Sequence, residues 1–226
     1  MAAMRVLVFG NRDDDDLGFV GEWGEPHRMI VDRRLRERDT GPVELSGYDL
    51  VISLGSVWSV YWPGIADRLA PEAAALKAAV MHGQPVLGIC FGAQMLSAAL
   101  GGEVTVAPSP EIGWVEIDTD LPDLVPPGPW MQWHIDRFTT PAGALEVART
   151  ESATQAFTIG RALAVQFHPE VDASIVKRWV AEDDDQLRAN QLSGIDVIAD
   201  AERNEGRARA DTFRMLDAFW ATIAGR

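Results

Sequence analysis

Cys90 is the only cysteine in this 226-residue chain, and its neighbours suit a catalytic nucleophile. It is the central residue of the pentapeptide GICFG at 88–92, with an apolar run at 85–89 before it and a helix-compatible run at 91–100 after it. A nucleophile on a strand-to-helix turn has a strained backbone, so glycine on each side avoids clashes, and the helix N-terminus favours a thiolate. The N–H of Phe91 would then be placed to hold an oxyanion. The alternative is an ordinary buried cysteine between two packing glycines.

His168 is the imidazole best placed to serve as the base for this nucleophile. It follows an apolar run at 162–167, and Pro169 biases it toward extended geometry. Residues two apart in an extended chain point to the same side, so Glu170 can hydrogen-bond one imidazole nitrogen and leave the other for a thiol. Taken alone, the pair could be a strand-end histidine with a solvated glutamate. Together with Cys90 it predicts a nucleophile–base–orienter triad.

Strand-like and helix-like segments alternate through the first half of the chain. Buried strands are expected at 4–10, 48–54 and 85–89, and helices at 66–82 and 91–100, while 28–38 is charged and helix-compatible. This alternation predicts parallel βαβ units and therefore an α/β fold, a doubly wound, mostly parallel sheet with helices on both faces.

The second half has a different pattern. Short strands are expected at 103–106, 112–118, 145–149, 155–159 and 162–167, with a proline-rich loop at 121–129. They predict a small antiparallel extension of the sheet. From residue 172 onward the pattern is helical. We expect a single domain over 1–226, with a core at about 4–180 and peripheral C-terminal helices at 181–226.

The charge balance narrows the classes of partner. A formal net charge of −14 and an isoelectric point near 4.6 disfavour binding to nucleic-acid phosphates and to anionic membrane surfaces. No apolar run reaches the roughly 18 residues of a membrane span, and the first residues do not resemble a signal peptide. A lone cysteine fits a reducing compartment. A cytoplasmic protein acting on a small molecule is expected.

The motifs GICFGAQ at 88–94 and QFHPE at 166–170 together resemble those of the class I (triad) glutamine amidotransferases. Secondary matches lie in the same order, LGS at 54–56, EIGW at 111–114 and WHID at 133–136. The resemblance runs from about residue 4 to residue 178. It is strongest to stand-alone domains similar to the glutaminase part of GMP synthase.

The resemblance implies a flavodoxin-like architecture, a set of site residues and a reaction. Glutamine would be hydrolysed to glutamate and ammonia through a cysteine thioester, with no metal or organic cofactor, and a separate synthetase subunit would receive the ammonia. The implied roles are nucleophile for Cys90, base for His168, orienter for Glu170, oxyanion hole for Phe91, Gly55 and Ser56, and substrate contact for Gln94, Trp133, His134 and Ile135.

One departure from the family pattern bears on the substrate. The family usually has Gly-Gly-Pro where this chain has Gly55-Ser56-Val57, so Ser56 can supply its N–H only if its backbone angles suit a side chain. An altered loop fits a second hypothesis, a self-contained γ-glutamyl hydrolase or peptidase acting on a small γ-glutamyl compound. A third is a non-catalytic protein that keeps the fold, against which the intact triad argues.

Four other features carry alternatives. The aspartates at 13–16 are more typical of a solvated loop than of a cation site, and 182–185 is expected to be a solvated face. The aromatic residues between 58 and 62 suit either a pocket mouth or simple packing. His134 and Asp136 could form a second catalytic pair, although the resemblance gives this stretch a supporting role.

Overall fold

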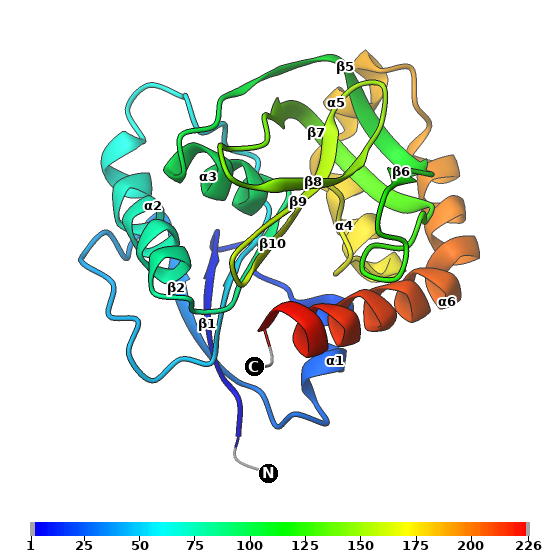
Figure 1. Cartoon of the computed structure of the whole chain (residues 1–226). Coiled ribbons are helices and arrows are strands. Elements are labelled where there is room, and N and C mark those ends of the chain that lie inside the picture. Colours follow the sequence, from blue (N-terminus) through cyan, green and yellow to red (C-terminus); the bar gives the residue numbers. More distant parts are fainter. Residues whose placement is uncertain (1–2, 225–226) are drawn as a thin grey trace.

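The computed structural model describes residues 3–224 and contains an eight-stranded sheet flanked by helices (Figure 1). The strand order is β2-β1-β3-β4-β10-β9-β8-β6. The first five strands are parallel: β2 (Ile30–Leu35), β1 (Arg5–Gly10), β3 (Leu50–Ser53), β4 (Val86–Ile89) and β10 (Ala162–Val165). The antiparallel extension consists of β9 (Thr154–Ile159), β8 (Leu145–Arg149) and β6 (Asp118–Thr119).

A separate antiparallel ribbon and a set of helices complete the described fold. The ribbon pairs β5 (Val104–Val115) with β7 (Trp130–Phe138). The helices are α1 (Gly18–Gly24), α2 (Ala66–Met81), α3 (Phe91–Ala99), α4 (Ala173–Glu182), α5 (Asp184–Ala189) and α6 (Gly194–Phe219), followed by a π-helical turn, η1 (Trp220–Ala224). The predicted α/β class, with a mostly parallel sheet and an antiparallel extension, is confirmed.

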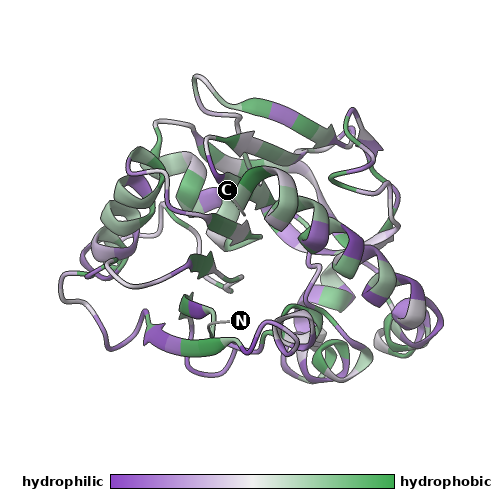
Figure 2. Cartoon of the chain, turned by 60° about the horizontal axis from the view of Figure 1, so that its bottom comes forward, coloured by the Kyte–Doolittle hydropathy of each residue, from purple (hydrophilic) through white to green (hydrophobic). Residues whose placement is uncertain are grey.

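The sheet separates two hydrophobic clusters because successive strand residues point to opposite faces. In β1, Val6 and Val8 belong to the cluster that includes α1 and α6, whereas Leu7 and Phe9 belong to the cluster that includes α2 and α3. The central strands carry mostly hydrophobic residues and the helices mix hydrophobic with hydrophilic ones (Figure 2). Both faces of the sheet are therefore covered.

The segment at 28–38 is a strand rather than the helix that its charges favoured. Residues Ile30–Leu35 pair in parallel with β1 along its whole length. They form the outer edge of the sheet, where charged side chains are tolerated and discourage further strand pairing. Two of them make ion pairs with neighbouring elements, Asp32 with Arg5 and Arg33 with Asp15.

The ribbon also differs from the prediction. The two short strands expected at 103–106 and 112–118 are one strand, β5, with a change of register between Val106 and Glu111. Its partner β7 was not predicted as a strand at all. The WHID motif therefore lies within regular structure, where alternate residues face opposite sides.

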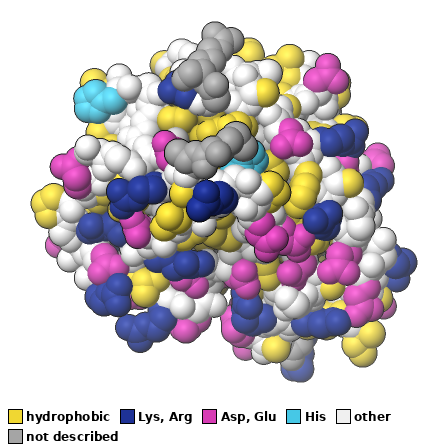
Figure 3. Space-filling view, turned by 90° about the horizontal axis from the view of Figure 1, so that it is seen from below, with side chains coloured by type: hydrophobic (Ala, Val, Ile, Leu, Met, Phe, Trp, Pro, Cys, Tyr) yellow, Lys and Arg dark blue, Asp and Glu magenta, His cyan; other side chains and the backbone are white. Residues whose placement is uncertain are grey.

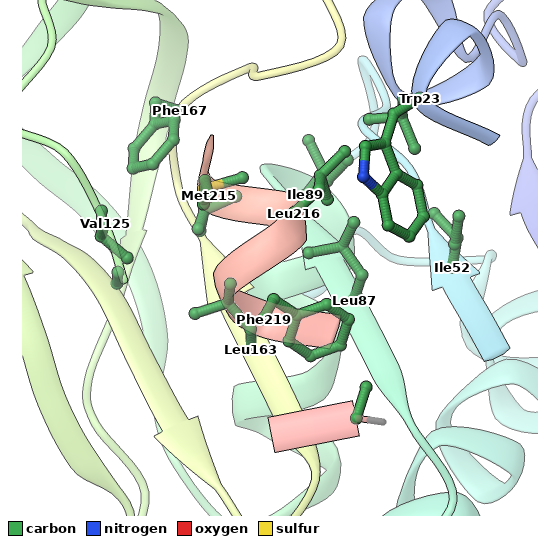
Figure 4. Packing of buried hydrophobic residues seen from close by; sticks show 14 of the residues in the cluster. Trp23, Ile52, Leu87, Ile89, Val125, Leu163, Phe167, Met215, Leu216 and Phe219 are labelled. Carbon is green, nitrogen blue, oxygen red and sulfur yellow. The ribbon is translucent and has the colours of Figure 1, made fainter. Parts of the chain in front are cut away.

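The C-terminal helix is more central than expected. Met215, Leu216 and Phe219 of α6 are buried in the cluster beneath the sheet, beside Leu87 and Leu163 (Figure 4). Their spacing gives the helix an apolar stripe facing the core, although its many charges suggested a peripheral position. Among residues 3–224, no helix is both long and apolar enough to cross a membrane.

Candidate active site

A cavity of about 550 Å³ opens beside the carboxyl ends of the parallel strands. This edge is the usual ligand site of an open α/β sheet. Ser56 follows β3, Cys90 follows β4 and His168 follows β10, and all three line the cavity. The predicted contact residues Gln94, Trp133, His134 and Ile135 line it as well.

Cys90 occupies the strained turn that its motif predicts. Its φ of 50° and ψ of −109° place a side chain in a region that non-glycine residues rarely adopt, directly before α3. A Cβ at Gly92 would lie 1.9 Å from the carbonyl oxygen of Ser53, and one at Gly88 would lie 2.9 Å from the oxygen of Gly92. The flanking glycines are therefore required by close packing. The cysteine N–H donates to Val165 at 2.8 Å, which ties the turn to β10.

His168 and Glu170 form a buried pair beside this cysteine. His168 Nδ1 lies 2.7 Å from Glu170 Oε1, and Nε2 has no hydrogen-bond partner among the described residues. Burial lowers the pKa of His168, but the negative charges of Glu170 and Cys90 outweigh it and raise that pKa well above its ordinary value. The ring packs edge-on against Trp179, with centroids 4.7 Å apart. The geometry can supply an oriented imidazole to a thiol.

The loop after β3 lies against both of these residues. A Cβ at Gly55 would be 3.0 Å from His168 Cε1 and 3.8 Å from Cys90 Cβ, so glycine is needed here for close approach. Neither Gly55 nor Ser56 has a positive φ. Ser56 therefore adopts its conformation without the strain that a left-handed residue would bring, and its Oγ accepts from the N–H of Trp58 at 3.1 Å.

Gln94 lies one helical turn beyond the cysteine and is almost fully buried. Its Nε2 is 3.4 Å from the carbonyl oxygen of Asp136 and 3.3 Å from Gln166 Oε1. Gln166 in turn directs its own Nε2 to Cys90 Sγ at 3.6 Å. A chain of amide groups thus connects the wall of the cavity with the sulfur.

The β7 residues that line the cavity differ in burial and in hydrogen bonding. Trp133 donates to Gln186 at 2.8 Å, and its carbonyl oxygen is 4.0 Å from Cys90 Sγ. His134 is buried, with Nδ1 2.9 Å from the Asp136 carbonyl oxygen and Nε2 3.2 Å from Glu111, whereas Ile135 is exposed. The Asp136 carboxylate instead accepts from Ser59 and Tyr61. The side chains of His134 and Asp136 are therefore not hydrogen-bonded to each other, as a second catalytic pair would require.

The sequence prediction missed a buried ion pair beneath the loop. Arg36 and Glu72 are both at least 97% buried and form two hydrogen bonds, Nε to Oε2 at 2.7 Å and Nη2 to Oε1 at 2.9 Å. Arg36 also donates to Asn11 at 2.8 Å and to the carbonyl oxygens of Leu54 and Gly55, each at 3.0 Å. Four arginines lie between 33 and 38, and no spacing signal separates Arg36 from its neighbours.

The aspartates at 13–16 are not the simple solvated loop that was expected. Asp14 lines the cavity and accepts from Trp179 Nε1 at 3.1 Å. Burial raises the pKa of Asp14, against the opposing effects of Trp179 and His168. Asp16 lies 3.7 Å from Arg178 in α4. Among residues 3–224 there is no group of three or more His, Cys, Asp or Glu side chains arranged to hold a metal ion.

Apart from histidines, the charged side chains that line the cavity are acidic. Of its described residues, none is Lys or Arg, and the acidic and tryptophan residues are Asp13, Asp14, Glu37, Asp136, Glu182, Asp183, Trp58, Trp62, Trp133 and Trp179. On the outer face shown in Figure 3, by contrast, Lys and Arg side chains lie among Asp and Glu. In the segment at 182–185, expected to be a solvated face, Glu182 is exposed but lines the cavity together with Asp183.

Comparison with known families identifies the class of protein. The model of the family Glutamine amidotransferase class-I matches residues 43–183, more than half of the chain. The chain belongs to this family and is an enzyme of that class, so the resemblance seen in its motifs is confirmed.

Individual relatives narrow the assignment. A glutamine-hydrolysing GMP synthase subunit of Sulfurisphaera tokodaii is 36% identical over 140 residues, which are 58% of this chain and 72% of that protein. The glutamine-hydrolysing GMP synthase of Aeropyrum pernix is 43% identical over 168 residues, 67% of this chain but 32% of that longer protein. A glutamine amidotransferase structure from Thermotoga maritima has a TM-score of 0.87 at 27% identity and covers 97% of this chain and 99% of that one. The chain is therefore homologous to the glutaminase subunit of GMP synthase.

Proposed function

We propose that this chain hydrolyses the side-chain amide of glutamine, with Cys90 as nucleophile, His168 as base and Glu170 as the residue that orients His168. The observation that carries the proposal is the strained Cys90 turn and the buried His168–Glu170 pair on one cavity. The raised pKa of His168 favours an imidazolium, which stabilises a neighbouring thiolate.

The proposed reaction is acyl transfer to water. The Cys90 thiolate attacks the amide carbon and forms a C–S bond, the C–N bond breaks, and His168 gives its proton to the departing nitrogen, which leaves as ammonia. A water molecule then gives a proton to His168 and attacks the thioester. The C–S bond breaks, glutamate leaves, and the thiolate and imidazolium are restored.

The remaining predicted residues are assigned to charge stabilisation and substrate contact. Phe91 begins α3, where the first N–H groups of a helix have no partner within the helix, and it would share the oxyanion with the N–H groups of the Gly55–Ser56 loop. Gln94 and the main chain of β7 at 133–135 would contact the amino and carboxylate groups of the substrate.

Ammonia would pass to a separate synthetase subunit. The Sulfurisphaera tokodaii relative is by its name one subunit of an assembly, and the longer GMP synthases extend well beyond the length that this chain covers. At the cavity rim, the side chains of Val57 and Trp62 are exposed and offer an apolar docking surface.

A second candidate, hydrolysis of a small γ-glutamyl amine, is favoured by the cavity itself. About 550 Å³ falls in the range of pockets for drug-sized ligands, which leaves room for a group beyond the glutamyl part. The described lining contains carboxylates and indole rings but no Lys or Arg, a composition that suits a positively charged amine.

One assay separates the two. The purified chain is incubated with glutamine and, separately, with γ-glutamyl amides of neutral and cationic amines, and the released glutamate and amine or ammonia are measured. Turnover of glutamine supports the first proposal. Turnover of the amides but not of glutamine would favour the second proposal instead. A chain that turns over neither, and whose Cys90 resists a glutamine-like electrophile, would contradict both.

A further inference from the structure

The guanidinium of Arg36 contacts both segments that carry the proposed oxyanion donors. It donates to the carbonyl oxygens of Leu54 and Gly55, and its central carbon lies 4.7 Å from the centre of the Phe91 ring. A charge at this depth is costly unless it is paired and fully hydrogen-bonded. The proposed reaction does not use Arg36, so its burial at this place needs a separate explanation.

We propose that Arg36 is a positioning residue that aims the oxyanion-binding loop, an inference that rests on the proposed function. A trans peptide unit is planar, with its C=O and N–H pointing in opposite directions. When Arg36 holds the carbonyl oxygens of Leu54 and Gly55, it turns the N–H groups of Gly55 and Ser56 away from itself. The loop itself packs against the proposed catalytic residues, because a Cβ at Gly55 would lie 3.0 Å from His168 Cε1 and 3.8 Å from Cys90 Cβ.

Glu72 keeps Arg36 in this orientation. It binds the guanidinium through both carboxylate oxygens and accepts from Ser53 Oγ at 2.6 Å. Glu72 thereby joins helix α2 to the end of β3 and, through Arg36, to the loop. The loop sequence Gly55-Ser56-Val57 contains no proline to restrict its backbone, so Arg36 supplies the restraint from outside.

The test is the variant Arg36→Lys, which keeps the charge but replaces five fixed donors by three on a flexible stem. The kcat for glutamine is expected to fall about 10²-fold, as for loss of one oxyanion donor, with KM little changed. Alkylation of Cys90 by iodoacetamide forms no oxyanion, so its rate is expected to stay at the wild-type value. Equal losses in hydrolysis and alkylation would overturn the inference.

A second readout does not depend on turnover. An aldehyde analogue of glutamine forms a reversible hemithioacetal with a thiol, and its oxygen would occupy the oxyanion position. Its affinity is expected to weaken in Arg36→Lys by the same factor as kcat. If the wild type hydrolyses glutamine and the variant matches it in both measurements, this inference fails while the proposed function stands. A wild type that neither turns over substrate nor binds the aldehyde contradicts both.

Arg161 provides a matched control. It also donates to main-chain carbonyl oxygens, those of Gly83 at 3.1 Å and Ile223 at 3.3 Å, but neither belongs to the loop after β3. Arg161→Lys is expected to leave the ratio of hydrolysis to alkylation unchanged. If Arg36→Lys does not fold, the double variant Arg36→Met/Glu72→Met removes both buried charges and should show the same split between the two rates.

Discussion

Two regions border the same cavity and are built in opposite ways. The inner floor consists of Cys90 and His168, which line the cavity, and of Arg36, Gly55 and Glu170 behind them. These five residues are buried and held by hydrogen bonds. The outer wall comprises Asp13, Asp14, Trp62, Trp179, Glu182 and Asp183. It comes from the segment after β1, the loop after β3, and α4 with the residue that follows it, and several of its side chains are exposed. If the proposed function is right, we expect the floor to determine which bond is broken and the wall to determine which group beyond the glutamyl part is accepted.

The largest effect is expected at the centre of the floor. Cys90→Ala removes the nucleophile, and glutamate release should fall at least about 10⁴-fold, because the members of a triad act as a unit. The fold should persist, which circular dichroism and a melting curve would check. Residual turnover above this level that does not come from contaminating enzyme would show that the cavity catalyses hydrolysis without Cys90.

Glu170→Gln tests the orientation and charge of the base. The rate should fall about 10²- to 10⁴-fold, because an amide can leave the imidazole in the wrong tautomer. Glu170 raises the pKa of His168, so the alkaline limb of the kcat/KM profile, which reports loss of the His168 proton, should move to lower pH in the variant. An alkaline limb at the wild-type position would show that the limb does not report His168.

Neutralising the wall tests whether it selects the substrate. The double change Glu182→Gln/Asp183→Asn should raise KM for a cationic γ-glutamyl amide by roughly 3- to 10-fold, an effect that weakens at high salt. The kcat/KM for glutamine should remain near the wild-type value. Equal changes for glutamine and for the cationic amide would remove the distinction between floor and wall.

The smallest effect is expected from a change of Asp14, which lies where the wall meets the floor, and it concerns stability rather than catalysis. Its pKa is raised by burial, so the folded state binds a proton more readily than the unfolded state, and this stabilisation is lost as pH rises through that pKa. Asp14→Asn should therefore gain stability relative to the wild type at pH 7–8, and the gain should shrink as pH falls. Melting temperatures between pH 4 and 8 would measure this, and a gain that grows toward low pH would contradict it.

The floor could be predicted from the sequence to a large extent because its chemistry follows local patterns. The glycines around Cys90 and the proline after His168 act on residues next to them in the sequence. The structure places the side chains of Cys90 and His168 on one cavity. The parallel sheet followed in the same way from alternating strands and helices. These features depend on short-range sequence, which a single chain displays directly.

The wall and the supporting ion pair could not be predicted because they depend on distant contacts. Arg36 and Glu72 are brought together only when β2 pairs with β1 and α2 packs beside them. The contact of Asp14 with Trp179 joins residues 165 positions apart. The charges of β2 suggested a helix because propensity does not record that the segment forms a sheet edge.

The strained backbone of Cys90 implies a trade-off between stability and activity. A side chain at φ 50° and ψ −109° costs on the order of 1–3 kcal/mol, and glycine would adopt this conformation at little cost. A glycine at this position would thus make a more stable protein without a nucleophile. Selection for catalysis, rather than for folding, would then be what keeps a cysteine at this turn.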